Sequence, residues 1–386
     1  MHPNINRLYQ IAQKPSRLIL GLMSGTSMDG LDMALCKIAG AGKEMQLALV
    51  AQTTWPYDEV VKGAIQKVFS KEQVSLSYLT GLHPWLALQH ANMIKETLKK
   101  WEVDAQYIDL IASHGQTIFH APKKLINDPL FGNATLQIVE ADHLAVHTGI
   151  ITISDFRQKH IAFGGEGAPL AIYGDYLLAK NETENRVLLN IGGIANYTYL
   201  PAGASMEQIH STDTGPGNTL MDQWVRKHFN KSYDEHGVIA GTGKVNDILL
   251  QQLLSHPFFS WVIPKTIGPE LFNLSFIEEA ISKTNIEIAP ADVLATLNEL
   301  TAITITDSIR RFIPNDTQYA IYVSGGGLHN GLLMDAIKRK VPKVRVESAD
   351  QIGIHADAKE AILFAILANE HVAGSAQSLG KVSFPL

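Results

Sequence analysis

The chain has only one cysteine, Cys36, among its 386 residues. A lone cysteine cannot form an intrachain disulfide, which is typical of proteins from reducing compartments. Cys36 lies in the apolar run 33–38, where a buried small side chain is expected rather than a reactive thiol. Residues 1–7 lack the charged and then apolar layout of a signal peptide, and no apolar run is long enough to span a bilayer. The sequence therefore predicts a cytoplasmic protein.

The chain also lacks an excess of positive charge and several common catalytic signatures. Its net charge is −6 without a long block of lysine or arginine, which argues against a nucleic-acid partner. The histidines, among them His83, His90 and His120, show no metal-ligand spacing. No Gly-x-Ser-x-Gly elbow surrounds Ser24 or Ser27, so serine hydrolysis is not expected.

A chain of this length exceeds what one hydrophobic core normally covers, so two domains or one duplicated architecture are expected. Residues 186–200 repeat the layout of residues 18–38: an apolar strand, a short loop of small residues and a return strand. The pattern predicts an α/β protein with two related domains. We expect them at 1–160 and 161–357, with a C-terminal helix, at about 358–386, packing back on the first.

Apolar periodicity predicts the elements around these hairpins. Further strands are expected at 47–54, 108–113, 135–139, 149–154, near 211 and near 322. Helices are expected within 57–101, with a turn at His83-Pro84, and at 141–147, 291–312 and 358–372. The polar segment 114–117 is expected to form a loop after its strand.

Glycine-rich turns follow several of these strands, and together they predict a nucleotide-phosphate site. Small residues leave backbone N–H groups open to phosphate, and a neighbouring carboxylate commonly holds Mg²⁺ or its water. None has the spacing of a Walker loop or a dinucleotide fingerprint, so a plain hairpin turn is the alternative for each. The residues concerned are Gly25, Asp29, Asp32, Gly192, Gly193, Asp213, Gly215, Gly217, Gly325, Gly326 and Gly327.

Asp155 and His114 are the other candidates for chemistry. Asp155 ends a predicted strand and is suited to act as a general base, although a helix cap or an ion-pair partner for Arg157 are alternative roles. His114 lies in the polar set 113–117, which offers contacts to sugar hydroxyls. A hydrogen-bonded structural histidine is the alternative there.

Several motifs, in order along the chain, resemble those of the anhydro-N-acetylmuramic acid kinases, a family of the actin-like sugar kinase and Hsp70 superfamily. They are GLMSGTSMDGLD (21–32), SHGQT (113–117), DFR (155–157), GGEGAPL (164–170), LNIGGIAN (189–196) and DTGPGN (213–218). The resemblance implies two actin-like, ribonuclease H-like domains with an ATP cleft between them. It further implies an enzyme that opens 1,6-anhydro-N-acetylmuramic acid with water and phosphorylates the released O6, giving N-acetylmuramic acid 6-phosphate in peptidoglycan recycling.

The resemblance also implies roles for individual residues. Asp155 would be the base that activates water, and Mg²⁺ would lie near Asp32 and Asp213, held through water. A small anhydro amino sugar would be the partner, and a homodimer is compatible with the family. Substrate contacts would come from His114, Gln116, Arg157 and Glu360. ATP contacts would come from Gly25, Thr26, Ser27, Met28, Asp29, Gly30, Leu31, Asp32, Gly192, Gly193, Asp213, Gly215, Gly217 and the adenosine turn Gly325, Gly326 and Gly327.

The chain departs from the family pattern at some positions. Val139-Glu140 replace a common Gly-Asp pair, Glu166 replaces a common Gln, and Pro269 and His329 stand where Arg is frequent. Val139, Glu140 and Glu166 flank the expected sugar site. The resemblance therefore indicates the type of reaction more firmly than the identity of the sugar. A kinase for another anhydro sugar such as levoglucosan, a non-enzymatic nucleotide-dependent sugar sensor and an actin-like assembly protein are the alternatives.

Overall fold

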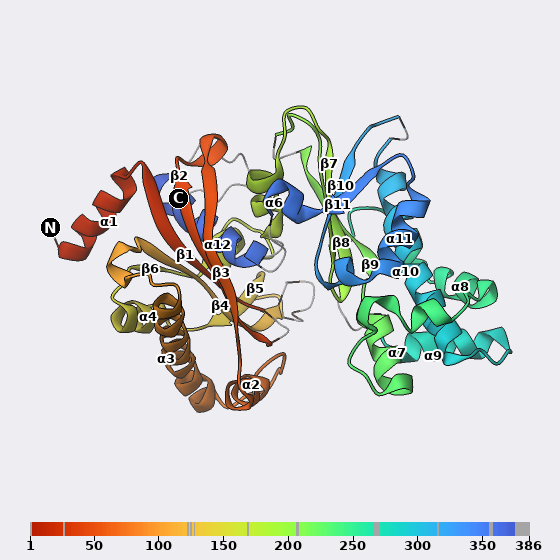
Figure 1. Cartoon of the computed structure of the whole chain (residues 1–386). Coiled ribbons are helices and arrows are strands. Elements are labelled where there is room, and N and C mark those ends of the chain that lie inside the picture. Colours follow the sequence, from red (N-terminus) through yellow and green to blue (C-terminus); the bar gives the residue numbers. More distant parts are fainter. Residues whose placement is uncertain are drawn as a thin grey trace. The chain divides into compact units, whose positions relative to one another are not determined.

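A computed structural model describes residues 2–25, 28–121, 123, 126, 128–167, 170–205, 208–265, 267, 271–314, 316–354 and 358–374. The chain divides into two compact units, which are coloured along the sequence in Figure 1. Unit 1 comprises residues 1–177 and 357–386, and unit 2 comprises residues 178–356. The boundary after residue 177 therefore lies later in the chain than the domain boundary at residue 160 that the sequence suggested.

Unit 1 contains a mixed sheet in the order β3-β2-β1-β4-β5, with β6 paired to β4. Strand β1 pairs antiparallel with β2 and parallel with β4, and β2 pairs antiparallel with β3. Strand β4 pairs parallel with β6 and antiparallel with β5. The strands are β1 (Ser16–Ser24), β2 (Gly30–Ala39), β3 (Gln46–Pro56), β4 (Leu110–Ala121), β5 (Ala134–Ile138) and β6 (Thr152–Ile153).

Unit 1 also contains seven described α-helices. They are α1 (Pro3–Gln13), α2 (Glu59–Gln66), α3 (Leu76–Lys100), α4 (Ala141–Thr148), α5 (Phe156–Ala162), α6 (Ala171–Ala179) and α12 (Lys359–Ala373). Helix α12 returns from the far end of the chain and packs directly on β1 (Figure 1). At Gly21 a Cβ atom would come within 1.9 Å of the Ala361 carbonyl oxygen, so only glycine permits this approach.

Helix α6 explains why unit 1 extends beyond residue 160. Its Asp175 pairs with Lys359 of α12 at 2.7 Å. Its Gly174 lies so close to Leu363 that a Cβ would contact the leucine side chain at 2.8 Å. These contacts join most of α6 to the helix that closes unit 1.

Unit 2 contains a second mixed sheet in the order β11-β10-β7-β8-β9. Strands β7, β8 and β9 form an antiparallel meander, and β10 is parallel to both β7 and β11. Read as 9-8-7-10-11, this order matches 3-2-1-4-6 in unit 1. The predicted α/β class with two related halves is confirmed. The strands are β7 (Arg186–Ile191), β8 (Ile194–Leu200), β9 (His210–Pro216), β10 (Ala320–Ser324) and β11 (Arg345–Ser348).

Helix α10 is the central helix of unit 2, with most of its residues buried. It contacts α7, α8 and α11 as well as strand β9. The hydrophobic core of unit 2 is separate from the core of unit 1. The helices are α7 (Thr219–Phe229), α8 (Asp247–Leu254), α9 (Leu274–Thr284), α10 (Pro290–Phe312) and α11 (Gly331–Lys340).

Two local expectations were wrong. Residues 114–117 lie inside strand β4 rather than in a loop, because this long strand continues past its buried half to pair with β5. Pro84 lies inside helix α3 and does not open a turn. Among the described residues, no helix is both long enough and apolar enough to cross a membrane.

Candidate active site

The end of the unit 1 sheet brings several predicted residues together. Strands β1, β4 and β6 are parallel, so their carboxyl ends point to one edge of the sheet. Ser24 closes β1 and pairs in register with Gln116 of β4, while Asp155 follows β6. Ligands in open α/β sheets bind at such an edge. The glycine turn after Ser24 and the candidate base Asp155 therefore belong to the same edge.

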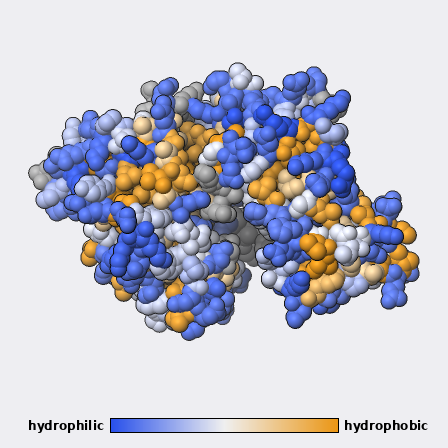
Figure 2. All heavy atoms as spheres, in the orientation of Figure 1, coloured by the Kyte–Doolittle hydropathy of each residue, from blue (hydrophilic) through white to orange (hydrophobic). Residues whose placement is uncertain are grey.

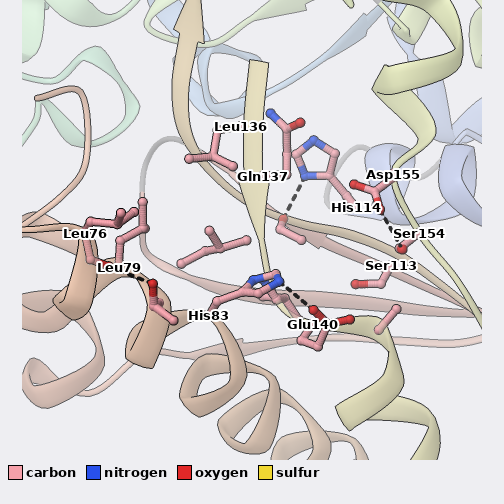
Figure 3. A pocket seen from close by; sticks show the side chains of 15 residues that line it. Leu76, Leu79, His83, Ser113, His114, Leu136, Gln137, Glu140, Ser154 and Asp155 are labelled. Atoms are coloured by element: carbon pink, nitrogen blue, oxygen red, sulfur yellow. Dashed lines mark hydrogen bonds and ion pairs between the residues drawn. The ribbon is translucent and has the colours of Figure 1, made fainter. Parts of the chain in front are cut away.

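A cavity of about 340 Å³ lies at this edge (Figure 3). Its volume is in the range of small-molecule sites. Asp155 and His114 line one part of the cavity, and His83 and Glu140 line another. The full lining is Leu76, Leu79, Thr80, His83, Ser113, His114, Gly115, Leu136, Gln137, Ile138, Val139, Glu140, Ala141, Ser154 and Asp155.

Asp155 is exposed and directed into this cavity. It occupies the N-cap position of α5, but its side chain makes no capping hydrogen bond. Its backbone has φ 59°, a left-handed conformation that aspartate tolerates better than most residues. Ser154 Oγ donates to Asp155 Oδ2 at 3.3 Å, the one hydrogen bond found to this carboxylate among the described residues. The other oxygen, Oδ1, has no hydrogen-bond partner among the described residues.

His114 and Arg157 form a pair behind the cavity. Arg157 Nε donates to His114 Nε2 at 2.8 Å, and His114 Nδ1 lies 2.8 Å from the Gly115 carbonyl oxygen. Because a guanidinium only donates and a carbonyl only accepts, His114 carries its proton on Nδ1. Burial, together with the Arg157 charge, lowers the pKa of His114 to about 3. Both ring nitrogens are thus engaged within the protein, and a neutral ring faces the cavity.

Val139 and Glu140, which depart from the family pattern, form part of the cavity wall. Val139 has φ 106°, which is strained for a β-branched residue. His83 holds this segment: its Nδ1 accepts from Val139 N at 3.0 Å and its Nε2 lies 2.8 Å from Glu140 Oε2 (Figure 3). Neither the role of His83 nor its contact with Glu140 was expected from the sequence, which gave no signal beyond Val139 and Glu140.

Glu360 lies in the first turn of α12 and does not line the cavity. The carboxylate keeps contact with solvent, yet the dense protein around it raises its pKa. Arg157 lowers this pKa and Asp32 raises it, so both charges lie within electrostatic range of Glu360. Arg157 thus connects His114, by a hydrogen bond, with Glu360, by charge.

The turn between β1 and β2 spans Gly25 to Asp29. Met28 N donates to the Gly25 carbonyl at 3.3 Å, and Met28 has φ 55°. Gly30 must be glycine, because a Cβ there would come within 2.4 Å of the Trp55 carbonyl oxygen. Asp29 is exposed, Leu31 is buried, and Asp32 is half-buried with its Oδ1 accepting from Thr54 Oγ1 at 2.6 Å. Thr26 and Ser27 lie outside the described residues.

Gln116 is fully buried and directed toward this turn rather than into the cavity. Its Nε2 donates to the carbonyl oxygens of Gly25 at 3.0 Å and Thr117 at 3.2 Å. Its Oε1 accepts from Ser24 Oγ at 2.5 Å. Both the oxygen and the nitrogen of the Gln116 amide are therefore engaged in hydrogen bonds within the protein.

Three glycine segments converge at the matching edge of the unit 2 sheet. Gly217 N donates to the Gly193 carbonyl at 2.9 Å, and Asn218 N donates to the Gly192 carbonyl at 2.8 Å. At Gly217 a Cβ would come within 2.2 Å of the Gly192 oxygen. Gly325 has φ 84°, and a Cβ there would contact the Ile191 carbonyl at 2.8 Å. Backbone packed this closely leaves space only for glycine.

The rest of these glycine segments have distinct local roles. Gly215 has φ 145° and lies where the β8–β9 register shifts. Gly326 and Gly327 open a short 3-10 turn after β10, and Gly327 lies against Ile191. Asp213 is half-buried in β9, with its Oδ2 accepting from Ile267 N at 2.8 Å. Burial raises the pKa of Asp213, while the Ile267 hydrogen bond and Lys265 lower it.

Each unit has a carboxylate near its glycine turns that is a candidate ligand for a divalent cation or its water. Within the described parts of the chain, no cluster of three or more His, Cys, Asp or Glu side chains could hold a metal. Mg²⁺ in phosphoryl-transfer sites commonly takes one or two carboxylates together with water and phosphate oxygens. Asp32 fits that role, since it lies beside the first turn and within the electrostatic range of Glu360. Asp213 has one oxygen engaged by Ile267 N, just as Asp32 has one engaged by Thr54, so the two carboxylates are comparable candidates for a cation or its water.

Ser113 is a cavity residue whose side chain lacks a partner. Its Oγ is buried and has no hydrogen-bond partner among the residues that the structure describes. It lies on β4 next to His114 and lines the cavity (Figure 3). A buried hydroxyl without a partner costs free energy, and a bound polar ligand would remove that cost. The sequence pointed to the polar set 113–117 as a whole but not to this residue in particular.

Comparisons with known proteins converge on one family. A family model described as anhydro-N-acetylmuramic acid kinase matches residues 17–383. A protein called anhydro-N-acetylmuramic acid kinase from Pseudoalteromonas atlantica is 51% identical over the whole of both chains. One of the same name from Pseudoalteromonas translucida is 48% identical, also over both whole chains. A third, from Caldanaerobacter subterraneus, is 38% identical over 98% of this chain and 97% of its own.

Proposed function

The chain belongs to the anhydro-N-acetylmuramic acid kinase family, and from that premise we propose how its residues act on 1,6-anhydro-N-acetylmuramic acid. Water opens the 1,6-anhydro bridge, and ATP phosphorylates the O6 that is released. The product is N-acetylmuramic acid 6-phosphate, and the reaction belongs to peptidoglycan recycling. Because both ATP and the recycled sugar are cytoplasmic metabolites, the cytoplasm is the proposed location.

The observation that carries the mechanism is Asp155 in the cavity of unit 1. One of its carboxylate oxygens accepts from Ser154, and we assign the other to the attacking water. As the water oxygen bonds to C1, its proton passes to Asp155 and the C1–O6 bond breaks. O6 then bonds to the γ-phosphorus as the bond to the β-phosphate oxygen of ATP breaks. One base thus couples ring opening to phosphoryl transfer.

The remaining cavity residues bind and orient the sugar in this proposal. Ser113 Oγ, which lacks a partner, supplies a hydrogen bond to a sugar polar group. His114 supplies a neutral ring surface, because both of its nitrogens are engaged. Arg157 fixes that ring, and Glu360 binds the sugar from the first turn of α12. The strained Val139 and the His83–Glu140 pair fix the wall that selects among anhydro sugars.

The glycine turns of each unit bind the nucleotide in this proposal. Their open backbone amides suit phosphate oxygens, and the packing described above keeps side chains away from them. Asp32 binds Mg²⁺ through water, with Asp213 as the second carboxylate. Mg²⁺ neutralises charge on the phosphates when it is bound. The residues assigned to ATP are Gly25, Thr26, Ser27, Met28, Asp29, Gly30, Leu31, Asp32, Gly192, Gly193, Asp213, Gly215, Gly217, Gly325, Gly326 and Gly327.

The decisive experiment supplies the purified chain with Mg-ATP and either 1,6-anhydro-N-acetylmuramic acid or levoglucosan. We expect a sugar 6-phosphate from the amino sugar, measured by mass spectrometry, with much lower turnover of levoglucosan. Transfer to levoglucosan alone would overturn the proposed substrate. The absence of any sugar phosphate, with binding of the amino sugar retained, would overturn the proposed reaction.

Asp155→Asn tests the catalytic role directly. Asparagine tolerates the left-handed backbone at this position, so the fold should persist. Turnover should fall at least ~10²-fold, because the base is lost. Nucleotide affinity, measured by calorimetry, should stay unchanged. Ser154→Ala is the matched control, because it removes only the hydrogen bond to Oδ2 and should lower turnover far less. Turnover near the normal rate in Asp155→Asn would remove Asp155 from the mechanism.

A further inference from the structure

Four buried polar side chains from separate elements form a hydrogen-bonded chain behind the first glycine turn. His90 lies on α3, Tyr57 follows β3, Ser24 ends β1 and Gln116 lies on β4. His90 Nε2 lies 2.6 Å from Tyr57 Oη, and Tyr57 Oη lies 2.6 Å from Ser24 Oγ. Ser24 Oγ donates to Gln116 Oε1 at 2.5 Å, and Gln116 Nε2 donates to the Gly25 carbonyl. The chain therefore runs from the interior of unit 1 to the first residue of the turn.

The direction of every hydrogen bond in this chain follows from its end at the turn. Gln116 Nε2 lies against two carbonyl oxygens, which only accept, so its amide orientation is fixed and its Oε1 must accept. Ser24 donates its single hydroxyl proton to Gln116, so Tyr57 must donate to Ser24. Because the Tyr57 hydroxyl proton is then engaged with Ser24, His90 must donate from Nε2 to Tyr57.

The far end of the chain agrees with this direction. A proton on His90 Nε2 leaves a lone pair on Nδ1, and Nδ1 has no hydrogen-bond partner in the described part of the protein. An unpaired lone pair costs less than a positive charge buried at this depth. Burial indeed lowers the pKa of His90 to about 3, which keeps the ring neutral. Every donor in the chain thus has one acceptor, and the order has a single solution.

Such a network is an unusual way to fill a core. Buried polar groups can often be replaced by apolar ones of similar volume without loss of stability. A network in which every donor has an acceptor instead favours one geometry, and here only the lone pair of His90 Nδ1 is left without a partner among the described residues. Here the geometry that it fixes is the Gly25 carbonyl, which also accepts from Met28 N and closes the turn.

We propose that the chain His90–Tyr57–Ser24–Gln116 positions Gly25 and, through it, Met28 for the nucleotide phosphates, which makes Gln116 a positioning residue rather than a sugar contact. The proposal rests on the proposed function, in which these residues bind ATP. Loss of a link lets the Gly25 peptide rotate and weakens its hydrogen bond with Met28 N, so fewer molecules hold the backbone of Gly25 and Met28 in the arrangement that binds phosphate. The effect falls on ATP and spares the sugar.

Tyr57→Phe tests the chain with the loss of one oxygen atom. We expect the KM for ATP to rise about fivefold, since one buried hydrogen bond contributes about 1 kcal/mol. The KM for the sugar and kcat at saturating ATP should stay within twofold of the parent. Tyr78→Phe is the matched control, because its hydroxyl also bonds within unit 1, to the Ala64 carbonyl, but lies outside the chain. It should leave the KM for ATP unchanged.

A pair of variants at His90 repeats the test at the opposite end. His90→Gln keeps an N–H near the position of Nε2 and should retain the parent KM for ATP. His90→Leu has similar size without the donor and should raise that KM as Tyr57→Phe does. Equal KM values for ATP in His90→Gln and His90→Leu would overturn positioning by the chain. Because these variants keep the side-chain volume, the test remains available if Tyr57→Phe fails to fold.

Gly25→Val separates failure of this inference from failure of the proposed function. It should weaken ATP binding in calorimetry with little change in sugar binding. If Gly25→Val leaves ATP affinity unchanged, the turn does not bind phosphate and the nucleotide assignment fails. If Gly25→Val weakens ATP binding but Tyr57→Phe and His90→Leu do not, the nucleotide assignment stands and the positioning role fails. A rise in the KM for the sugar alone in Tyr57→Phe would return Gln116 to the sugar site.

Discussion

The two sheets share a strand order, but they fix their first turns by different means. In unit 1 the turn after β1 is held by side chains, through the four-residue chain that ends at Gly25. In unit 2 the turn after β7 is held by backbone, through hydrogen bonds from Gly217 and Asn218 to Gly193 and Gly192. Two sheets with the same strand order therefore hold the corresponding turns with different groups, side chains in unit 1 and backbone in unit 2. Side-chain substitutions should affect unit 1, and added Cβ atoms should affect unit 2.

Gly217→Ala should have the largest effect on the backbone-held turn. Its Cβ would lie within 2.2 Å of the Gly192 oxygen, so the turn or β9 must move. We expect a loss of about 3 kcal/mol in the free energy of unfolding, at the upper end for overpacking. Urea unfolding monitored by tryptophan fluorescence, to which Trp224 in the core of unit 2 contributes, measures it.

Gly241→Ala is the control for this substitution. Gly241 also belongs to unit 2, but a Cβ there would meet no atom within 4 Å. Its free energy of unfolding should stay within about 0.5 kcal/mol of the parent, as for surface substitutions in general. Similar losses in both variants would show that the close approach at Gly217 is not what holds the turn.

The side-chain-held turn should instead reveal itself in the pH dependence of stability. His90 has a pKa of about 3 in the folded chain, against its usual 6.5, because it is buried. Between these values the unfolded chain binds a proton that the folded chain does not, so stability falls as the pH falls from about 6.5 toward 3. The contribution of His90 is about 1.4 kcal/mol per pH unit within that window.

The variant His90→Gln isolates this contribution, since it keeps the donor and removes the titration. Its free energy of unfolding should decline less steeply than that of the parent between pH 6 and pH 4, by about the slope given above. His114 also has a lowered pKa and remains in both proteins, so its contribution cancels. Parallel curves for the two proteins would mean that His90 is protonated in the folded chain, and a neutral ring donating from Nε2 to Tyr57 would then be wrong.

The sequence predicted more of the backbone than of these networks. Apolar runs located β1 and β7, the first strands of the two meanders, because a strand that is buried on both faces must be apolar on both. The polar residues 114–117 were misplaced in a loop, since nothing local shows that β4 continues to pair with β5. Helix α6 was missed as part of unit 1, because its partners on α12 lie almost two hundred residues later in the chain.

For the candidate site, too, the sequence identified residues but not the contacts that they make. Asp155 and the glycine segments could be named from their positions at strand ends. The partners that decide what each residue can do are all distant in sequence. His114 was predicted to contact the sugar and that stays a prediction, but its engagement by Arg157 and the Gly115 carbonyl could not be foreseen. Gln116 stands beside His114 on β4 and yet serves Gly25, a partner that lies on another strand's turn some ninety residues earlier.

Asn218→Ala should have the smallest effect, and it tests whether unit 2 depends on side chains at all. Asn218 Nδ2 donates to the Ile191 carbonyl at 3.3 Å, a side-chain hydrogen bond to the end of β7. Its side chain makes no capping hydrogen bond to α7, so the substitution removes little else. We expect a loss of about 0.5–1 kcal/mol in the free energy of unfolding, with the KM for ATP within twofold of the parent.

Ser24→Ala, at the matching strand end in unit 1, removes a donor and an acceptor from buried partners and should lower the free energy of unfolding by about 2 kcal/mol. If Asn218→Ala were as costly as Ser24→Ala in urea unfolding, both turns would rest on side chains, and the shared strand order would extend to a shared way of holding the turn.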